Sequence, residues 1–562
     1  MSLMSTLARL EAVRAGRAQP LATVRHRHLS GRPLVLVPLT TAGEAGAPLG
    51  AMVGTDPDAP HVLVVTQPRD RDLRWEFLAE LAGHVVPYLE SYADAVEPVE
   101  RTETDPETGK RVKVEAELCL DAPQLIVPSR AGIEYVRLLG RSMRFRRTAE
   151  EDPENPYPAP ARVPLLGRWF THLAERSRVP GSSMLLSATD LLSRHWATGQ
   201  SNLEDQHLGA LLAWIDPPRG TSGAERALRA ELGRGPDGQL LVPPAGPATD
   251  PAFDNKLLAP AIAKFDAARA TAAANGNGSG NGAGTGDGAR AAAEQAVRQL
   301  VVAQMESTWR AVWESIGLLR ELPAGERTED RWTGDRWSYT GHRDRVRAGE
   351  GPQPRRDDAV TAARKLATRE TEQVRLEAQE ALDDLLVMAG RRLAGEAFAG
   401  EVTEVVMEWT GSTRPSPRPL VTVATEDRPQ LADGVSGDGN TKVYRSLDGR
   451  PQSAQFVRRE EDGRLVLRLL DKMGRGKDPV AGSVPEKGDR VCWTLFEHDA
   501  RGGPKLPDAE RTPWTHGGPP AHLAGSAAPH PTGSAPVHPA GSAPALPMPD
   551  SAPDPVTAED LL

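Results

Sequence analysis

Two histidines and two adjacent carboxylates stand close together in the stretch HWATGQSNLEDQHLGALLAWIDPPRG, residues 195–220. Such side chains bind metal ions or exchange protons, so they are the catalytic candidates of this chain. They are His195, Glu204, Asp205 and His207. Their spacing matches no standard metal motif, whereas Ser201 and Glu204 have the S-x-x-E spacing of a helix capping box. A joint between two helices with polar caps is the favoured interpretation, and a metal-dependent hydrolase is the alternative.

Three arginines recur at helical spacing further upstream, at Arg137, Arg141 and Arg144. A row of guanidinium groups on one helical face suits phosphate, because each group is planar, permanently charged and a bidentate donor. These three are therefore candidate contacts to phosphate or nucleic acid. The acidic residues at 150–154 leave the alternative of a solvated face balanced by neighbouring carboxylates.

Aromatic residues alternate with arginines in EDRWTGDRWSYTGHRDRVR, residues 329–347, which we interpret as a polar loop. Aromatic rings stack on bases and arginines follow a nucleic-acid backbone, so the stretch is a candidate single-strand binding site. The candidates are Arg331, Trp332, Arg336, Trp337, Tyr339 and Arg343. The alternative is that the tryptophans anchor the loop on neighbouring helices, with arginines over their faces.

No cofactor and no metal are predicted from the motifs of this chain. The segment GVSGDGNTK, residues 434–442, has glycines at phosphate-loop spacing, but Asn440 stands where the phosphate-binding lysine is required. The two cysteines, Cys119 and Cys492, are too far apart in sequence for a zinc motif. These observations favour a non-catalytic protein.

The composition narrows the class of protein. The formal net charge is −10, which argues against a general nucleic-acid coat and leaves room for local basic patches. No apolar run of about 18 residues and no signal peptide are visible, so a cytoplasmic protein without membrane contact is expected. Arginine in an Ala-, Gly- and Pro-rich background predicts GC-rich coding DNA, as in a high-GC bacterium.

The expected fold class is multidomain α+β, with an N-terminal α/β unit, a central array of long helices, a small C-terminal β-barrel and a disordered tail. In the first unit, short apolar runs bounded by Gly, Pro and Asp predict strands. Those strands are expected at 21–29, 33–39, 49–54, 61–67 and 124–128, with an exposed polar hairpin before the last. The expected ranges are 1–150 for the α/β domain, 160–217 for a helical domain, 218–255 for a loop-rich connection, 256–402 for the helical array with a flexible linker at 275–288, 403–512 for the barrel and 513–562 for the tail.

Alternating apolar residues from about Thr403 predict five short strands of a barrel, joined by turns such as Asp448-Gly449. A small barrel beside long helices resembles the accessory barrel on a helical stalk in some superfamily 1 helicases. That resemblance is architectural, carries no residue roles, and implies a chain that works beside a separately encoded motor.

The tail ends in PVTAEDLL, an acidic and apolar peptide of the kind that docks on partner proteins. Its candidate docking residues are Val556, Glu559, Asp560, Leu561 and Leu562. The leading hypothesis is a non-catalytic adaptor or accessory subunit of a larger cytoplasmic assembly. Its expected partners are a protein, such as a separately encoded ATPase or helicase, and nucleic acid. Direct single-strand binding is the second alternative after the metal-dependent hydrolase.

Overall fold

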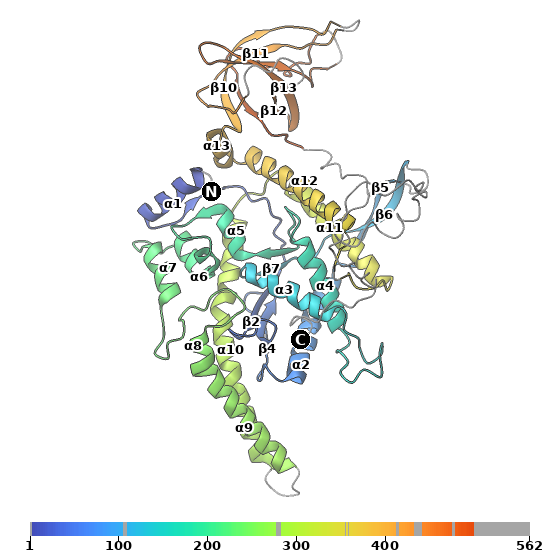
Figure 1. Ribbon diagram of the computed structural model, residues 1–562, viewed down its shortest axis with the longest axis vertical. Coiled ribbons are helices and arrows are strands. Elements are labelled where there is room, and N and C mark those ends of the chain that lie inside the picture. The colour runs from blue at the N-terminus through green and yellow to red at the C-terminus, as the bar shows by residue number, and fades with distance from the viewer. Residues whose placement is uncertain are drawn as a thin grey trace, which may run out of the picture.

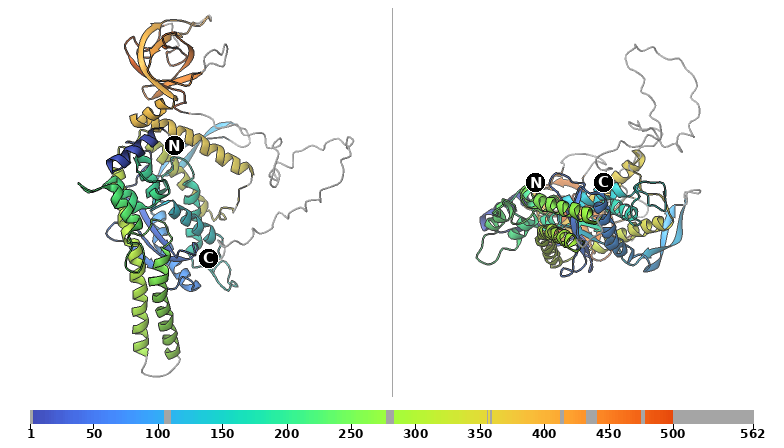
Figure 2. Two further views of the ribbon diagram at one scale, coloured as in Figure 1. Left: turned by 60° about the vertical axis from the view of Figure 1, so that its left-hand side comes forward. Right: turned by 90° about the horizontal axis from the view of Figure 1, so that it is seen from below.

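The computed structural model describes residues 3–104, 110–276, 283–354, 356–357, 359–411, 415–431, 441–474 and 478–499. A central body carries the C-terminal barrel at one end and a long helical hairpin at the other (Figures 1 and 2). The tail expected at 513–562, with its docking peptide, lies outside the described residues. The mixed α+β class with a C-terminal barrel is confirmed.

A five-stranded mixed sheet forms the centre of the body. Its strands, in spatial order, are β4 (His61–Val64), β3 (Pro48–Gly54), β2 (Leu34–Thr40), β7 (Leu125–Val127) and β8 (Leu185–Ser187). The first three are antiparallel, and β2, β7 and β8 are parallel. Every residue of β2 and β3 is buried, as expected for apolar runs covered on both faces.

Helices cover both faces of this sheet. Leu34 and Leu36 face a core shared with α2 (Arg71–Glu90), α3 (Arg130–Met143), α4 (Val163–Arg176) and α11 (Thr328–Arg347). Val35 and Val37 face the opposite core, which is built by α5 (Ala188–His195), α6 (Leu208–Ile215), α9 (Ala259–Gly276) and α10 (Ala283–Arg320). The period-two alternation of strand side chains therefore divides the body into three layers.

The segment 160–217, expected to be all-helical, contributes strand β8 to the sheet. Three residues are too few to show a strand period, and Leu185 and Leu186 also fit the helical pattern around them. The first expected strand, 21–29, is wrong, because this segment has only an isolated bridge from Arg25 to Ala324. The expected polar hairpin is confirmed as β5 (Val96–Thr104) and β6 (Arg111–Cys119).

Helix α10 packs directly against the sheet. A Cβ atom on Gly50 would stand 2.8 Å from Cγ1 of Val301 and 2.9 Å from the Leu63 carbonyl oxygen, so glycine permits the close approach. Beyond the sheet, α10 pairs with α9 as the projecting hairpin (Figure 2). Both helices extend into the segment 275–288 where a linker was expected, and residues 277–282 lie outside the described part of the chain.

The expected polar loop at 329–347 is wrong, because these residues lie in α11. After α11 the expected helical array continues as two helices with a break between them, α12 (Ala359–Asp383) and α13 (Leu385–Leu393). Asp384 makes the break: its carboxylate accepts hydrogen bonds from the backbone N–H groups of Leu386, Thr23 and Val24. A side chain that caps α13 thus also fixes the N-terminal segment.

The C-terminal barrel follows α13. It is closed, in the order β10 (Ala397–Val406), β11 (Leu420–Ala424), β14 (Leu465–Leu469), β13 (Arg450–Arg459), β12 (Lys442–Leu447) and β15 (Arg490–Thr494). Phe398, Phe456 and Trp493 fill its core. The turn predicted at Asp448-Gly449 is confirmed, with φ values of 48° and 71°. Strand β10 was not expected, because it begins inside the range interpreted as helical.

The remaining elements are short or peripheral. They are α1 (Leu3–Ala15), α7 (Gly223–Leu232), α8 (Pro251–Phe253), a 3-10 turn at Glu204–Gln206, a π-helical turn at Asp254–Leu258, and the two-residue strands β1 (Gln19–Pro20) and β9 (Trp196–Ala197). Among the helices that the structure describes, none combines the length and the apolar character that a bilayer span requires.

Candidate phosphate-binding cleft

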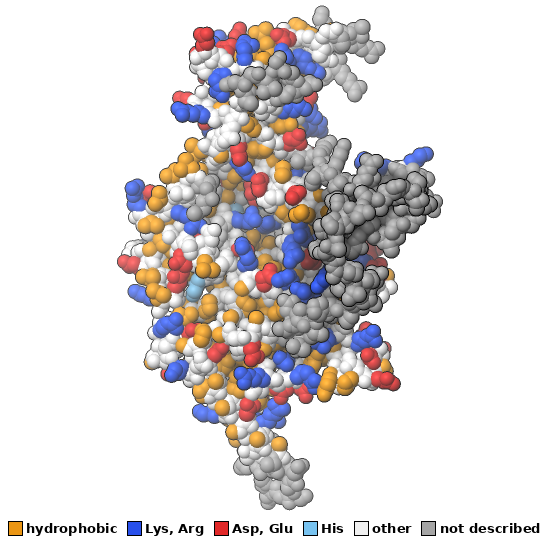
Figure 3. Space-filling view, in the orientation of Figure 1, with side chains coloured by type: hydrophobic (Ala, Val, Ile, Leu, Met, Phe, Trp, Pro, Cys, Tyr) orange, Lys and Arg blue, Asp and Glu red, His pale blue; other side chains and the backbone are white. Residues whose placement is uncertain are grey.

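A cleft of about 850 Å³ opens between α3, α4, α11 and α12. Nine of its lining residues are Arg or Lys, against two carboxylates, Glu175 and Asp357. The cationic residues are Arg137, Arg141, Arg144, Arg176, Arg178, Arg345, Arg364, Lys365 and Arg369. Figure 3 shows Lys and Arg side chains gathered on this face of the body. We refer to it as the arginine cleft.

Helix α3 supplies one wall of the arginine cleft. Arg137, Arg141 and Arg144 follow the helical period, while the opposite side of α3 is buried in the core. The helix lies tight against α4: a Cβ atom on Gly140 would stand 2.6 Å from the Thr171 backbone nitrogen. Arg144 is buried and donates from Nε to the Gln353 carbonyl oxygen at 3.0 Å, which fixes the rim. The structure thus places these three arginines, which the sequence selected as candidate phosphate contacts, in the lining of one cleft.

A stacked pair of histidines from α4 and α11 contributes one ring, that of His172, to the lining of the arginine cleft. The rings of His172 and His342 are 4.1 Å apart and inclined by 9°. Burial, followed by the positive charges of Arg345 and Arg168, lowers the pKa of His342 to about 3. Burial, with His342 and Arg345, also holds the pKa of His172 well below its usual range. Both rings are neutral at pH 7, so the positive charge belongs to the walls.

The cationic side chains of the arginine cleft differ in their partners. Arg178 and Arg369 share Glu175, at 3.5 and 3.3 Å. Lys365 is 2.7 Å from Asp357. Exposed Arg345 and Arg364 make no side-chain ion pair or hydrogen bond with the residues that the structure describes. These two side chains are the best placed to bind an incoming anion, because neither must first break an ion pair with a carboxylate.

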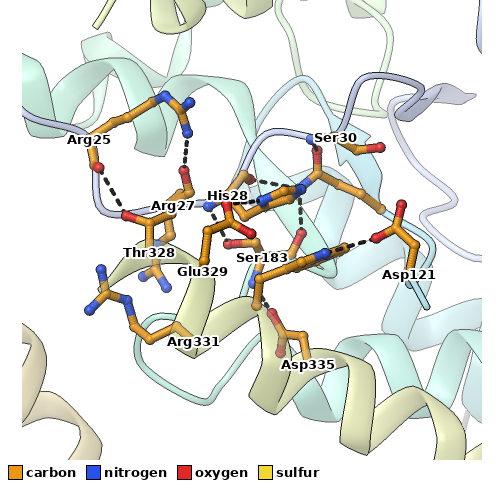
Figure 4. Close-up of polar contacts among 12 residues, drawn as sticks. Arg25, Arg27, His28, Ser30, Asp121, Ser183, Thr328, Glu329, Arg331 and Asp335 are labelled. Atoms are coloured by element: carbon orange, nitrogen blue, oxygen red, sulfur yellow. Dashed lines mark hydrogen bonds and ion pairs between the residues drawn. The ribbon is translucent and has the colours of Figure 1, made fainter. Parts of the chain in front are cut away.

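Arg176, at the inner end of the arginine cleft, has a structural partner. Its Nε donates to Asp335 Oδ1 at 2.7 Å, and this carboxylate is fully buried. Asp335 also accepts from the Ser182 hydroxyl at 2.8 Å and the Ser183 N–H at 2.6 Å. Figure 4 shows Ser183 and Asp335 facing each other across this joint. The network ties α4, the loop after it and α11 into one wall.

The aromatic candidates of α11 point into the protein. Trp332 stacks on His28 at 4.2 Å and donates from Nε1 to Asp121 at 2.8 Å. Tyr339 is fully buried, stacks on Trp169 at 5.3 Å and donates its hydroxyl hydrogen to the Leu89 carbonyl. Trp337 is half-buried, with the Arg101 guanidinium 5.3 Å from its ring centre. The stacking faces of Trp332 and Tyr339 are therefore already occupied by protein rings.

The arginine candidates of α11 hold neighbouring segments in place. Arg331 donates to Gln379 and to Nδ1 of His26. Arg336 donates to the Cys119 carbonyl at 2.8 Å and pairs with Glu97. Arg343 is 4% exposed and donates to the Ala93 carbonyl at 2.7 Å. Of the two interpretations of this stretch, the geometry matches the anchoring one, on a helix instead of a loop.

The four catalytic candidates are engaged by separate partners. The predicted capping box is confirmed: the Ser201 N–H donates to Glu204 at 2.6 Å, and the Glu204 N–H to the Ser201 hydroxyl at 3.3 Å. That bond from the Ser201 backbone lowers the pKa of Glu204. Asp205 is 2% exposed, accepts from Thr198 at 2.6 Å, and has its pKa raised by burial.

The two histidine candidates have different roles in the fold. His207 caps α6 by accepting from the Ala210 N–H at 3.3 Å. His195 ends α5 and donates from Nδ1 to the Ala22 carbonyl at 3.0 Å. Burial lowers the pKa of both histidines. Within the described residues, no three His, Cys, Asp or Glu side chains are arranged to hold a metal ion.

Sequence reasoning missed the second wall of the arginine cleft. Arg364, Lys365 and Arg369 recur at helical spacing on α12, but the sequence pattern assigned these residues only to the array of long helices. The same spacing rule that selected Arg137, Arg141 and Arg144 would have found them. Their convergence with α3 required the fold, since more than 200 residues separate the two helices. No protein-family model, no curated protein and no solved structure matches this chain.

Proposed function

We propose that this chain is an accessory nucleic-acid-binding protein that holds the phosphate backbone in the arginine cleft. The observation that carries the proposal is the charge of the lining, nine cationic side chains against two carboxylates, in a chain of net charge −10. Like charges crowded around one cleft focus a local positive potential, which attracts a polyanion and concentrates it there. The acidic remainder of the chain discourages binding elsewhere.

The contacts are expected to read the backbone and not the bases. Guanidinium groups bind phosphate oxygens without sequence information. Of the three aromatic candidates on α11, Trp332 and Tyr339 are buried against His28 and Trp169. Trp337 is half-buried, and the Arg101 guanidinium lies over its ring. Sequence-independent binding that depends steeply on salt follows, because each neutralised phosphate releases condensed counterions. Such a protein acts as an accessory component that presents nucleic acid to a larger assembly.

The test is fluorescence anisotropy of a labelled oligonucleotide, titrated with the full chain between about 50 and 200 mM salt. The Arg345→Glu/Arg364→Glu variant removes two cleft cations that make no side-chain ion pair or hydrogen bond with the described residues. Losing two phosphate contacts should reduce the slope of log affinity against log salt by about 1.8 and weaken binding by more than about tenfold.

The matched control is Arg226→Glu/Arg229→Glu on α7, which makes the same charge change on an exposed helix outside the cleft. This control should retain nearly all of the affinity. Equal losses in both variants would mean that net charge, and not the arginine cleft, governs binding. Absence of binding by the unaltered chain at the lowest salt would refute the proposal.

A further inference from the structure

A second, smaller cavity of about 130 Å³ lies beside the N-terminal segment 21–27. It is enclosed by that segment, the C-terminal end of α5, and facing residues of α12 and α13. It shares no lining residue with the arginine cleft. Its polar lining residues are His26, Arg27, Arg194, His195 and Glu380. The nucleic-acid proposal uses none of these groups.

Hydrogen bonds define the protonation of both histidines in this cavity. Arg331 donates to Nδ1 of His26 at 3.1 Å, which leaves the proton on Nε2, 3.9 Å from Asp383. His195 donates from Nδ1 to the Ala22 carbonyl, which leaves its Nε2 as an acceptor. Burial, followed by the charge of Arg331, lowers the pKa of His26 to about 4. Both rings are therefore neutral at pH 7 and do not contribute charge.

The cavity lining contains two arginines, Arg27 and Arg194, and one carboxylate, Glu380. Arg194 and Glu380 pair at 3.3 Å, and both side chains reach solvent, with exposed fractions of 46% and 26%. Arg27 is half-buried, and its Nη1 donates to the neutral Ser182 carbonyl at 3.1 Å. Burial lowers the pKa of Arg27 to about 9, which still leaves it protonated at pH 7. Glu380, the one carboxylate of the lining, is thus engaged by Arg194.

The negative charges nearest to Arg27 are already committed. Glu380 is engaged by Arg194, and Asp335 accepts from Arg176, Ser182 and Ser183. Removing a cation from water without a dedicated counter-charge is costly, so an anion in the cavity would lower the free energy of the folded state. The lining also includes the apolar side chains of Leu21, Val24 and Val387.

We propose that this cavity binds a small organic carboxylate, whose charged group pairs with Arg27 and whose hydrocarbon part packs on Leu21, Val24 and Val387. The size of the cavity limits the ligand, since a cavity of about 150 Å³ accommodates benzene. A ligand of about six non-hydrogen atoms or fewer fits here. The apolar side chains of the lining favour such a molecule over a fully hydrophilic oxyanion such as inorganic phosphate.

Isothermal titration calorimetry of the full chain with sodium propionate tests the proposal, with sodium chloride at matched ionic strength as the blank. Saturable binding is expected. The Arg27→Met variant keeps the side-chain volume and removes the charge, and it should weaken binding by about tenfold or more. Val387→Phe keeps every charge and fills the cavity, so it should also weaken propionate binding by at least about tenfold.

Arg32→Met is the matched control, because Arg32 lies over the rings of Tyr88 and Tyr92, outside the cavity. It should bind propionate as the unaltered chain does. If Arg27→Met fails to fold by circular dichroism, Val387→Phe decides alone. No saturable heat with propionate, binding of inorganic phosphate in its place, or unchanged affinity in both folded variants would overturn the proposal.

Discussion

Two groups of arginines differ in their hydrogen-bond partners. One group lies on α11 and faces the protein, and the other lines the arginine cleft. Arg331, Arg336 and Arg343 donate to carbonyl oxygens and side chains of neighbouring segments. Arg345, on the same helix, and Arg364, on α12, make no such contact with the described residues. Both groups have the same residue type and helical spacing. Residue type and spacing therefore do not distinguish the two groups, and the partners that the fold supplies decide which guanidinium groups can meet an anion.

The largest change in the free energy of unfolding is expected for Asp335→Ala. The substitution leaves Arg176, Ser182 and Ser183 without their buried acceptor. Breaking such a buried ion pair is expected to lower the free energy of unfolding by about 3 to 5 kcal/mol, measured by urea denaturation. The control is Asp330→Ala, exposed in the first turn of α11, which should cost less than about 1 kcal/mol. Similar losses in the two variants would contradict the structural role given to Asp335.

A second test exchanges one arginine from each group. Arg343→Met removes a buried donor to the Ala93 carbonyl and should lower the free energy of unfolding by about 2 kcal/mol. Arg364→Met should change stability by less than about 0.5 kcal/mol and instead reduce the salt dependence of oligonucleotide binding. Urea denaturation and anisotropy on both variants give the comparison. If Arg364→Met proves the more destabilising, the division between anchoring and cleft arginines is wrong.

The smallest expected effect is on the pH dependence of stability, and it comes from the neutral, buried ring of His342. His342 has a folded pKa of about 3, below the unfolded value of about 6.5, so only the unfolded chain gains a proton between these values. Its contribution to stability is complete above pH 6.5 and is lost as the pH falls toward 3. Between about pH 7.5 and pH 5.5 the loss should be about 1.4 kcal/mol. The His342→Phe variant keeps a ring in this position and should lose that much less stability over this interval. Identical pH dependence in both proteins would contradict the buried neutral histidine.

Much of the fold follows from local patterns in the sequence. The apolar runs of β2 and β3, the hairpin turn at Asp448-Gly449 and the capping box of Ser201 and Glu204 each depend on neighbouring residues. The errors arose where distant contacts decide the outcome. The three-residue strand β8 exists because β7 pairs with it, and Asp384 ends α12 because it also binds Thr23 and Val24.

Residue type and short-range period were enough to predict which residues carry charge, which helical faces are apolar, and that a barrel with tight turns follows the helices. The availability of those charges depends on contacts between segments that are distant in the chain. Arg345 and Arg364 line one cleft because α11 and α12 both border it in the folded chain, and Arg343 is unavailable because a backbone carbonyl accepts its hydrogen bond. A local pattern specifies the donor, whereas the acceptor comes from a part of the chain that folding alone brings near.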